Sequence, residues 1–123
     1  MAPADLPEGL QWYDRDGRPI LPAEAERLLA TPGYDKVRCT TVLDMADLDW
    51  VRDVVTVWIG VDLSAEHEVP MIFETVVFDR DHAPLVCRAY ATEAEAASDH
   101  DALVTAARAE ATDAVVLESA GSA

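Results

Sequence analysis

Cysteine and histidine, which serve as nucleophiles, general bases and zinc ligands, are few in this 123-residue chain. There are two cysteines, Cys39 and Cys87, and three histidines, His67, His82 and His100. Neither cysteine has a neighbouring histidine or a cluster of basic residues, so we do not expect nucleophilic cysteine chemistry. A structural zinc site needs about four thiolate or imidazole ligands, and these five residues are widely scattered. The sequence therefore predicts no metal site and no cofactor.

The three histidines differ in their surroundings. His67 lies between Glu66 and Glu68, and His82 follows two aspartates, so both belong to segments that we expect to be loops. Loops that follow alternate ends of neighbouring strands point in opposite directions, so these two side chains are not expected to meet. His100 falls on the apolar stripe of the last expected helix, where a core histidine with one hydrogen-bond partner is favoured over a ligand. No catalytic residue is predicted.

Glu74 is a single carboxylate inside residues 70–78, a segment that is apolar on both faces of an expected strand. A buried carboxylate needs a partner. We favour a cross-strand ion pair with Arg88 on a partly wet face of the sheet. Two other interpretations stay open: Glu74 is a functional carboxylate in a pocket with Tyr90 or His100, or it lies at an interface.

The charge of the chain is strongly negative. It has 24 Asp and Glu against 9 Lys and Arg, a formal net charge of −15. Direct binding to nucleic acid is not expected, because a phosphate backbone is held by clustered Lys and Arg. Acidic residues concentrate along the last expected helix, at Glu93, Glu95, Asp99 and Asp101. They form either a solvated face or a docking surface for a basic groove of a protein partner, including a groove that normally holds nucleic acid.

The elements that position these residues fit one domain, because 123 residues leave no room for a second core. We expect a loose Pro- and Gly-rich arm at residues 1–11, the domain at residues 12–113, and a frayed tail at residues 114–123. An Asp-Gly turn between apolar residues predicts a hairpin over residues 12–20. Strong helix formers after a proline predict a helix over residues 22–30.

Four segments have the composition of strands. Residues 36–43 alternate, and Cys39 and Leu43 belong to the apolar face of that half-buried strand. Residues 54–61 are β-branched and apolar on both faces, which suits the middle of a sheet. The remaining two strands are expected at residues 70–78 and 85–90. Since short loops join consecutive strands, the sheet is expected to be an antiparallel meander.

The last helix has the clearest start signal in the chain. Thr92 and Glu95 form a capping box, and the helix is expected to continue through about Glu110. Its apolar stripe is expected at Ala97, His100, Val104, Ala107 and Ala111. The predicted fold is therefore α+β: an N-terminal hairpin and helix, then an antiparallel sheet of about four strands with the C-terminal helix packed on one side.

The first residues show no basic and apolar pattern of a secretory signal, and no apolar run reaches the ~20 residues of a membrane span. We therefore expect a cytoplasmic protein with reduced thiols and no membrane partner.

Several segments carry a resemblance to a known family. They are Trp12-Tyr13-Asp14-x-Asp16-Gly17-x-Pro19-Ile20, Tyr34 with Val37, Thr56-Val57-Trp58-Ile59-Gly60-Val61-Asp62, Pro70-Met71-Ile72-Phe73-Glu74-Thr75-Val76-Val77-Phe78, and Tyr90-x-Thr92-x-x-Glu95-Ala96 with His100. In these segments the chain resembles a family of small uncharacterised proteins of actinobacteria and their phages. A histidine and a Gly-rich loop usually follow the position of Asp62 in that family, where this chain has Leu63 and an acidic loop. The resemblance implies an intracellular accessory protein and is compatible with a phage origin.

Two function hypotheses follow. The first is a non-catalytic interaction protein that occupies a basic surface of a protein partner, as an inhibitor competing with nucleic acid would, or that self-associates through its apolar sheet as a homodimer. The second is a small-molecule-binding or enzymatic domain with a pocket between the sheet and the last helix, lined by Glu74, Arg88, Tyr90 and His100.

Overall fold

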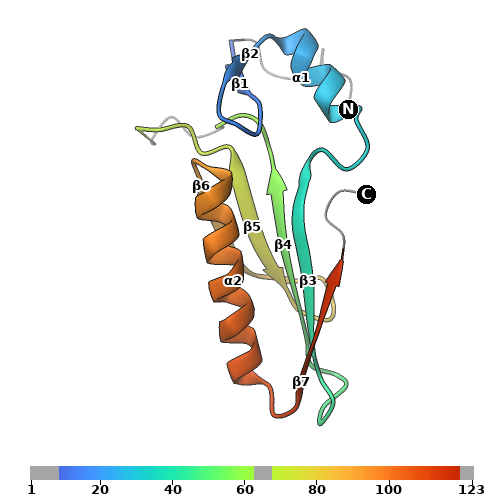
Figure 1. Cartoon of the computed structure of the whole chain (residues 1–123). Coiled ribbons are helices and arrows are strands. Elements are labelled where there is room, and N and C mark those ends of the chain that lie inside the picture. Colours follow the sequence, from blue (N-terminus) through green and yellow to red (C-terminus); the bar gives the residue numbers. More distant parts are fainter. Residues whose placement is uncertain (1–8, 63–67, 120–123) are drawn as a thin grey trace.

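The computed structural model describes residues 9–62 and 68–119. It is an α+β fold in which one long helix lies along a five-stranded antiparallel sheet (Figure 1). A two-stranded hairpin and a short helix sit at one end of the sheet. The elements in chain order are β1 (Trp12–Tyr13), β2 (Pro19–Ile20), α1 (Pro22–Leu29), β3 (Lys36–Asp44), β4 (Val51–Trp58), β5 (Phe73–Phe78), β6 (Pro84–Tyr90), α2 (Glu93–Glu110) and β7 (Ala114–Ser119).

The predicted meander is confirmed. The strand order is β6-β5-β4-β3-β7, and every neighbouring pair is antiparallel. β4 lies in the centre, as its apolar composition on both faces indicated. The hairpin is also confirmed, with Trp12 opposite Ile20, and Asp14 caps its turn by accepting the backbone N–H groups of Asp16 and Arg18.

The C-terminal strand was missed. Residues 114–119 form β7, paired with β3, so the prediction of a frayed tail is wrong for this part and the sheet has five strands instead of about four. Residues 120–123 lie outside the described residues, as do residues 1–8 of the expected N-terminal arm. Of that arm, Leu10 packs against the cluster formed by Trp12, Ala25 and Val61. Local sequence did not predict strand β7, because it forms by pairing with the free edge of β3.

One face of the sheet packs against α2. Along β3 to β5 the buried positions alternate, and they include Val42, Val54, Phe73 and Val77. On β3 this covered face carries Thr40, Val42 and Asp44, whereas Cys39 and Leu43 point to the other side. The expectation that the apolar set of residues 36–43 faces the core is therefore wrong for Cys39 and Leu43. Val37, at the bulge between Lys36 and Arg38, does pack against the core cluster around Trp58.

The opposite face, here called the open face, is covered by no described helix. Its residues are only partly buried or exposed, and most are apolar. Strand alternation and the register place these residues on it: Lys36, Cys39, Thr41, Leu43, Val51, Asp53, Val55, Val57, Glu74, Val76, Phe78, Leu85, Cys87, Ala89, Val115, Leu117 and Ser119.

Helix α2 begins as predicted. The Thr92 hydroxyl accepts the backbone N–H of Glu95 at 3.1 Å and donates its own proton to the Glu95 carboxylate at 3.0 Å. The buried side of the helix is formed by Ala96, His100, Leu103 and Ala107. The expected stripe is thus right at His100 and Ala107 and wrong by one residue at Ala97 and Val104, because the small side chains of α2 mark its buried face weakly. Ala111, the last expected member, is the C-cap and lies after the helix.

The largest buried side chain at the hairpin end is Trp58. Its indole N–H donates to the carbonyl of Tyr13 at 3.0 Å, and its ring meets Tyr34 edge to face. Gly60 closes over it with a φ of +78°, and a Cβ there would lie 2.7 Å from the Trp58 ring. Trp58 therefore joins the hairpin to the sheet.

Among the residues described, no helix has both the length and the apolar composition needed to cross a lipid bilayer.

Candidate functional site

A row of hydrogen-bonded side chains crosses the covered face beneath α2. His100 is fully buried; its Nε2 lies 2.8 Å from the Thr40 hydroxyl and its Nδ1 lies 2.7 Å from the Thr56 hydroxyl. Thr56 in turn lies 2.6 Å from the Thr75 hydroxyl, and Thr40 donates to Glu118 at 2.7 Å. The network therefore connects four strands, β7, β3, β4 and β5, through one histidine of α2.

Counting donors determines the histidine tautomer. Thr40 gives its single hydroxyl proton to Glu118, so it must accept the proton on Nε2 of His100. A neutral ring then leaves Nδ1 as an acceptor for the Thr56 hydroxyl, which accepts from Thr75. Every polar atom of this row is satisfied with His100 neutral. The favoured interpretation of His100, a core histidine, agrees with this geometry, although it has two partners instead of one.

The pKa of His100 is lowered from its ordinary value of 6.5, mainly because burial disfavours the charged ring and also because Arg38 is near. As the pH falls, the unfolded chain therefore binds a proton at His100 before the folded protein does. The contribution of neutral His100 to the free energy of unfolding is present above pH 6.5 and is lost as the pH drops below it. Two carboxylates also make the protein less stable in acid, at lower pH than His100. A hydrogen bond from the Thr112 backbone lowers the pKa of Asp44, and a hydrogen bond from Arg38 lowers the pKa of Glu118.

We expect the free energy of unfolding to be nearly constant between about pH 7 and pH 8, and to fall below pH 6.5 by up to about 1.4 kcal/mol per pH unit for one proton. Urea unfolding at pH 7.5, 6.5 and 5.5 measures this slope. The variant His100→Gln is expected to flatten the profile between pH 6.5 and 5.5. An equal slope in the variant would show that other groups take up the proton.

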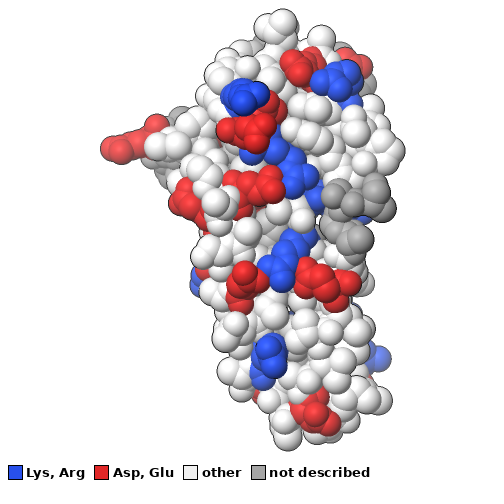
Figure 2. Space-filling model, in the orientation of Figure 1, with Lys and Arg blue, Asp and Glu red and all other residues white. Residues whose placement is uncertain are grey.

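Arginines of the rest of the fold pair with the acidic residues of α2. Arg15 binds Glu93 through two hydrogen bonds of 2.7 and 2.9 Å, and Arg88 binds Asp99 at 3.0 Å. Two more arginine-to-helix pairs are Arg38 with Asp101 and Arg52 with Glu110. Figure 2 shows the result on this side of the molecule: basic and acidic side chains lie against one another and do not form one acidic field.

This pairing changes the interpretation of the four acidic residues expected to bind a partner. Glu93, Asp99 and Asp101 each bind an arginine, and the Glu95 carboxylate accepts the Thr92 hydroxyl proton. Partly exposed ion pairs contribute about 0–1 kcal/mol each, so their main effect here is to orient α2 on the sheet. A docking role for these residues stays a prediction, and it would have to displace existing ion pairs.

Glu74 and Arg88 do not pair. The register sets Glu74 opposite Ala89 and Arg88 opposite Thr75, so their side chains leave the sheet on opposite faces. The predicted cross-strand ion pair is therefore wrong, because Arg88 is one residue away from the position that faces Glu74. Glu74 lies instead on the open face beside Cys87, whose pKa is raised by burial and by the Glu74 carboxylate.

Replacing Glu74 with glutamine should change the free energy of unfolding by no more than about 1 kcal/mol. The side chain is only half-buried, and glutamine has nearly the same shape. Thermal unfolding of the two proteins side by side measures the effect. A loss of folding would show that Glu74 belongs to a buried hydrogen-bond network, and would contradict its position on the open face.

The four residues expected to line one pocket lie in three places. Glu74 is on the open face, and His100 is enclosed in the threonine network. Only Arg88 and Tyr90 share a depression, a shallow groove of about 690 Å³ between β6 and α2. Both bind Asp99 there, and burial together with Asp99 raises the pKa of Tyr90 to about 12. The polar groups of the groove therefore satisfy one another.

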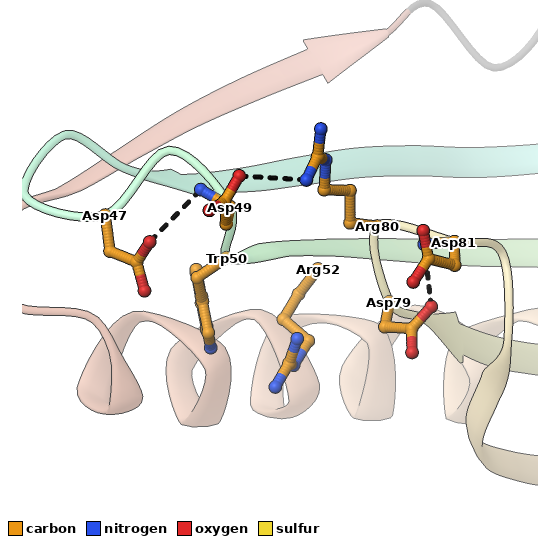
Figure 3. Close-up of a pocket in the computed structure, with 7 residues that line it drawn as sticks. All are labelled: Asp47, Asp49, Trp50, Arg52, Asp79, Arg80 and Asp81. Carbon is orange, nitrogen blue, oxygen red and sulfur yellow. Dashed lines mark hydrogen bonds and ion pairs between the residues drawn. The ribbon is translucent and has the colours of Figure 1, made fainter.

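A second depression of about 420 Å³ lies at the far end of the sheet, between the β3–β4 and β5–β6 loops (Figure 3). Asp49 and Arg80 form an ion pair of 2.8 Å across it, and the Arg52 guanidinium lies 4.7 Å from the centre of the Trp50 ring. The other lining residues are Asp47, Asp79 and Asp81. Within residues 9–62 and 68–119, no group of three His, Cys, Asp or Glu side chains is placed to hold a metal ion. His82 lies on the adjoining turn, exposed, with a φ of +63°; His67 lies outside the described residues.

The open face lacks a partner element among the described residues. Val55, Val57, Val76 and Phe78 form its centre on β4 and β5. A hollow of about 280 Å³ lies beside them on β3, bordered by Lys36, Arg38, Cys39, Val55, Thr56, Val57 and Ser119. Burial is the main cause that raises the pKa of Cys39, as it is for Cys87, which disfavours the reactive thiolate form of both side chains.

The sequence contained a signal for this face. β4 and β5 are apolar on both faces, yet among the residues described α2 is the one long helix that can cover them. The fold and the site thus define a class: an α+β protein whose antiparallel sheet is covered by a helix on one side and open on the other. Comparison of the chain with protein-family models, with curated proteins and with solved structures finds no match.

Proposed function

We propose that this protein is a non-catalytic interaction protein whose binding surface is the open face of its sheet. One observation carries the proposal: five strands present a continuous, mostly apolar face that no described element covers. Monomeric proteins rarely expose contiguous apolar patches larger than a few hundred Å². A patch that spans a whole sheet is typical of a surface that binds another protein.

The distribution of charge supports the same surface. The chain carries −15 in total, yet the charged residues on the open face are Lys36, Asp53 and Glu74 among the residues the structure describes. Asp53 is partly satisfied, because the Thr41 hydroxyl donates to it at 2.5 Å. The resemblance to small actinobacterial and phage proteins fits an accessory role. The acidic-docking hypothesis has less support because the carboxylates of α2 are engaged, and the pocket hypothesis has less because its four residues are dispersed.

Replacing Val76 with lysine places a charge in the centre of the open face and is expected to abolish association through it. Val76 lies between Val55 and Cys87 and is half-buried, so a lysine there can reach solvent and the isolated chain should still fold. The matched control is Ala109→Lys, which adds the same charge on the exposed side of α2.

Two measurements test this: light scattering of the purified proteins, and affinity capture from a lysate of the cells that encode the protein. The wild type and Ala109→Lys should associate with a second copy or with a captured protein, and Val76→Lys should not. The proposal is contradicted if the wild type associates with nothing, or if Val76→Lys retains every associating species.

A further inference from the structure

A basic and an acidic residue flank the central strand of the open face at the same level. Lys36 on β3 pairs in register with Val57 on β4, and Val57 pairs with Glu74 on β5. The three side chains therefore form one row across the face, with opposite charges at equal distances from β4. Lys36 is the only lysine of the chain.

This arrangement is self-complementary. If two copies face each other about a two-fold axis running along β4, β3 of one copy lies over β5 of the other. Lys36 of each copy then faces Glu74 of its partner, which forms two identical ion pairs. Facing sheets pack about 10 Å apart, a gap that an extended lysine and an extended glutamate span together.

We propose that the open face binds a second copy of this chain in a face-to-face, two-fold dimer held by its apolar strands and aligned by reciprocal Lys36–Glu74 pairs. This inference rests on the proposed function, since it names the occupant of the same surface. Other protein surfaces could cover an apolar face, but the chain itself supplies both halves of this charge pattern.

The size of the face is sufficient for a dimer. Five strands spaced about 4.8 Å apart, over about six or seven residues of about 3.3 Å, cover roughly 500 Å² per copy before side-chain relief is counted. Two such faces bury about 1,000 Å² or more in total, which reaches the threshold for a specific interface. Two copies approaching by any more acidic surface would repel each other, whereas this face carries one base and two acids.

Asp53 limits the stability of this dimer. It lies on β4 and therefore close to the proposed axis, where the two carboxylates of the dimer approach each other. Its hydrogen bond from Thr41 can be retained by an amide oxygen. Asp53→Asn should therefore tighten the dimer, because it removes the repulsion between the two Asp53 carboxylates at the axis.

Sedimentation equilibrium over a wide range of protein concentration tests the inference with a charge swap. The wild type should dimerise, and Lys36→Glu or Glu74→Lys alone should weaken the dimer by about tenfold or more, because each places like charges opposite one another. The double variant Lys36→Glu/Glu74→Lys should recover most of the lost affinity. Melting curves of each variant, with Glu74→Gln as a neutral reference, confirm that the monomers fold.

The outcomes separate this inference from the proposed function. If the wild type is monomeric at every concentration but Val76→Lys loses a captured protein, the open face binds a different partner and the second-copy inference fails alone. If a dimer forms and the double variant is no better than the single variants, the two-fold arrangement is wrong. If a dimer forms and is insensitive to Val76→Lys, it uses another surface and the second-copy inference fails. If Val76→Lys also retains every captured protein, the proposed function fails with it.

Discussion

Replacing Trp58 with alanine should lower the free energy of unfolding by about 3–5 kcal/mol. The ring is 2% exposed and packs against Leu28, Ile72, Phe73 and Ala96. Its removal leaves a large cavity at the junction of α1, the hairpin and the sheet. It also removes the only side-chain hydrogen bond between β4 and Tyr13 that the described residues show. Alanine cannot replace either contribution, so the hairpin should detach from the sheet before global unfolding.

Chemical denaturation followed by circular dichroism measures this loss. Trp50→Ala is the matched control, because Trp50 lies in the loop before β4 and contacts the Arg52 guanidinium near the surface. Its replacement should cost no more than about 1 kcal/mol. Similar stability losses for the two variants would mean that Trp58 is not the anchor between hairpin and sheet.

Replacing His100 with alanine should lower the free energy of unfolding by about 3 kcal/mol or more. The substitution leaves a cavity under α2 and removes a hydrogen-bond partner from both Thr40 and Thr56. A buried polar group without a partner costs about 1–3 kcal/mol. The effect therefore exceeds that of removing an apolar side chain of the same size.

The control for His100 is His82→Asn. His82 is exposed on the β5–β6 turn with a φ of +63°, a conformation that asparagine tolerates. This variant should unfold within about 0.5 kcal/mol of the wild type. If His100→Ala were equally mild, the threonine hydroxyls would have to find other partners, and the network would not specify the position of α2.

Local signals in the sequence determined most of the elements. The Asp-Gly turn marked the hairpin, the capping box of Thr92 and Glu95 marked the start of α2, and β-branched runs marked β4 and β5. Each signal depends on residues a few positions apart. For this reason the helices, the meander and the central position of β4 followed from the sequence.

Only the tertiary structure decided which residues meet. Strand β7 exists because β3 offers it an edge, and a run such as residues 114–119 does not contain that information. Thr40 on β3 is buried, and Cys39 is not, because α2 covers the side of the sheet where His100 bonds Thr40 and Thr56. When a strand is apolar on both faces, its sequence does not indicate which face a helix will cover.

The candidate site divides in the same way. Composition showed that β4 and β5 are apolar on both sides. Because one long helix covers only one side, the other side of the sheet was expected to be an uncovered apolar face. The register then set Glu74 on the open face and Arg88 on the other, and a shift of one residue would have exchanged them. The pairing of arginines with the acids of α2 joins residues as far apart as Arg15 and Glu93. Such contacts depend on how the whole chain closes, which no local pattern records.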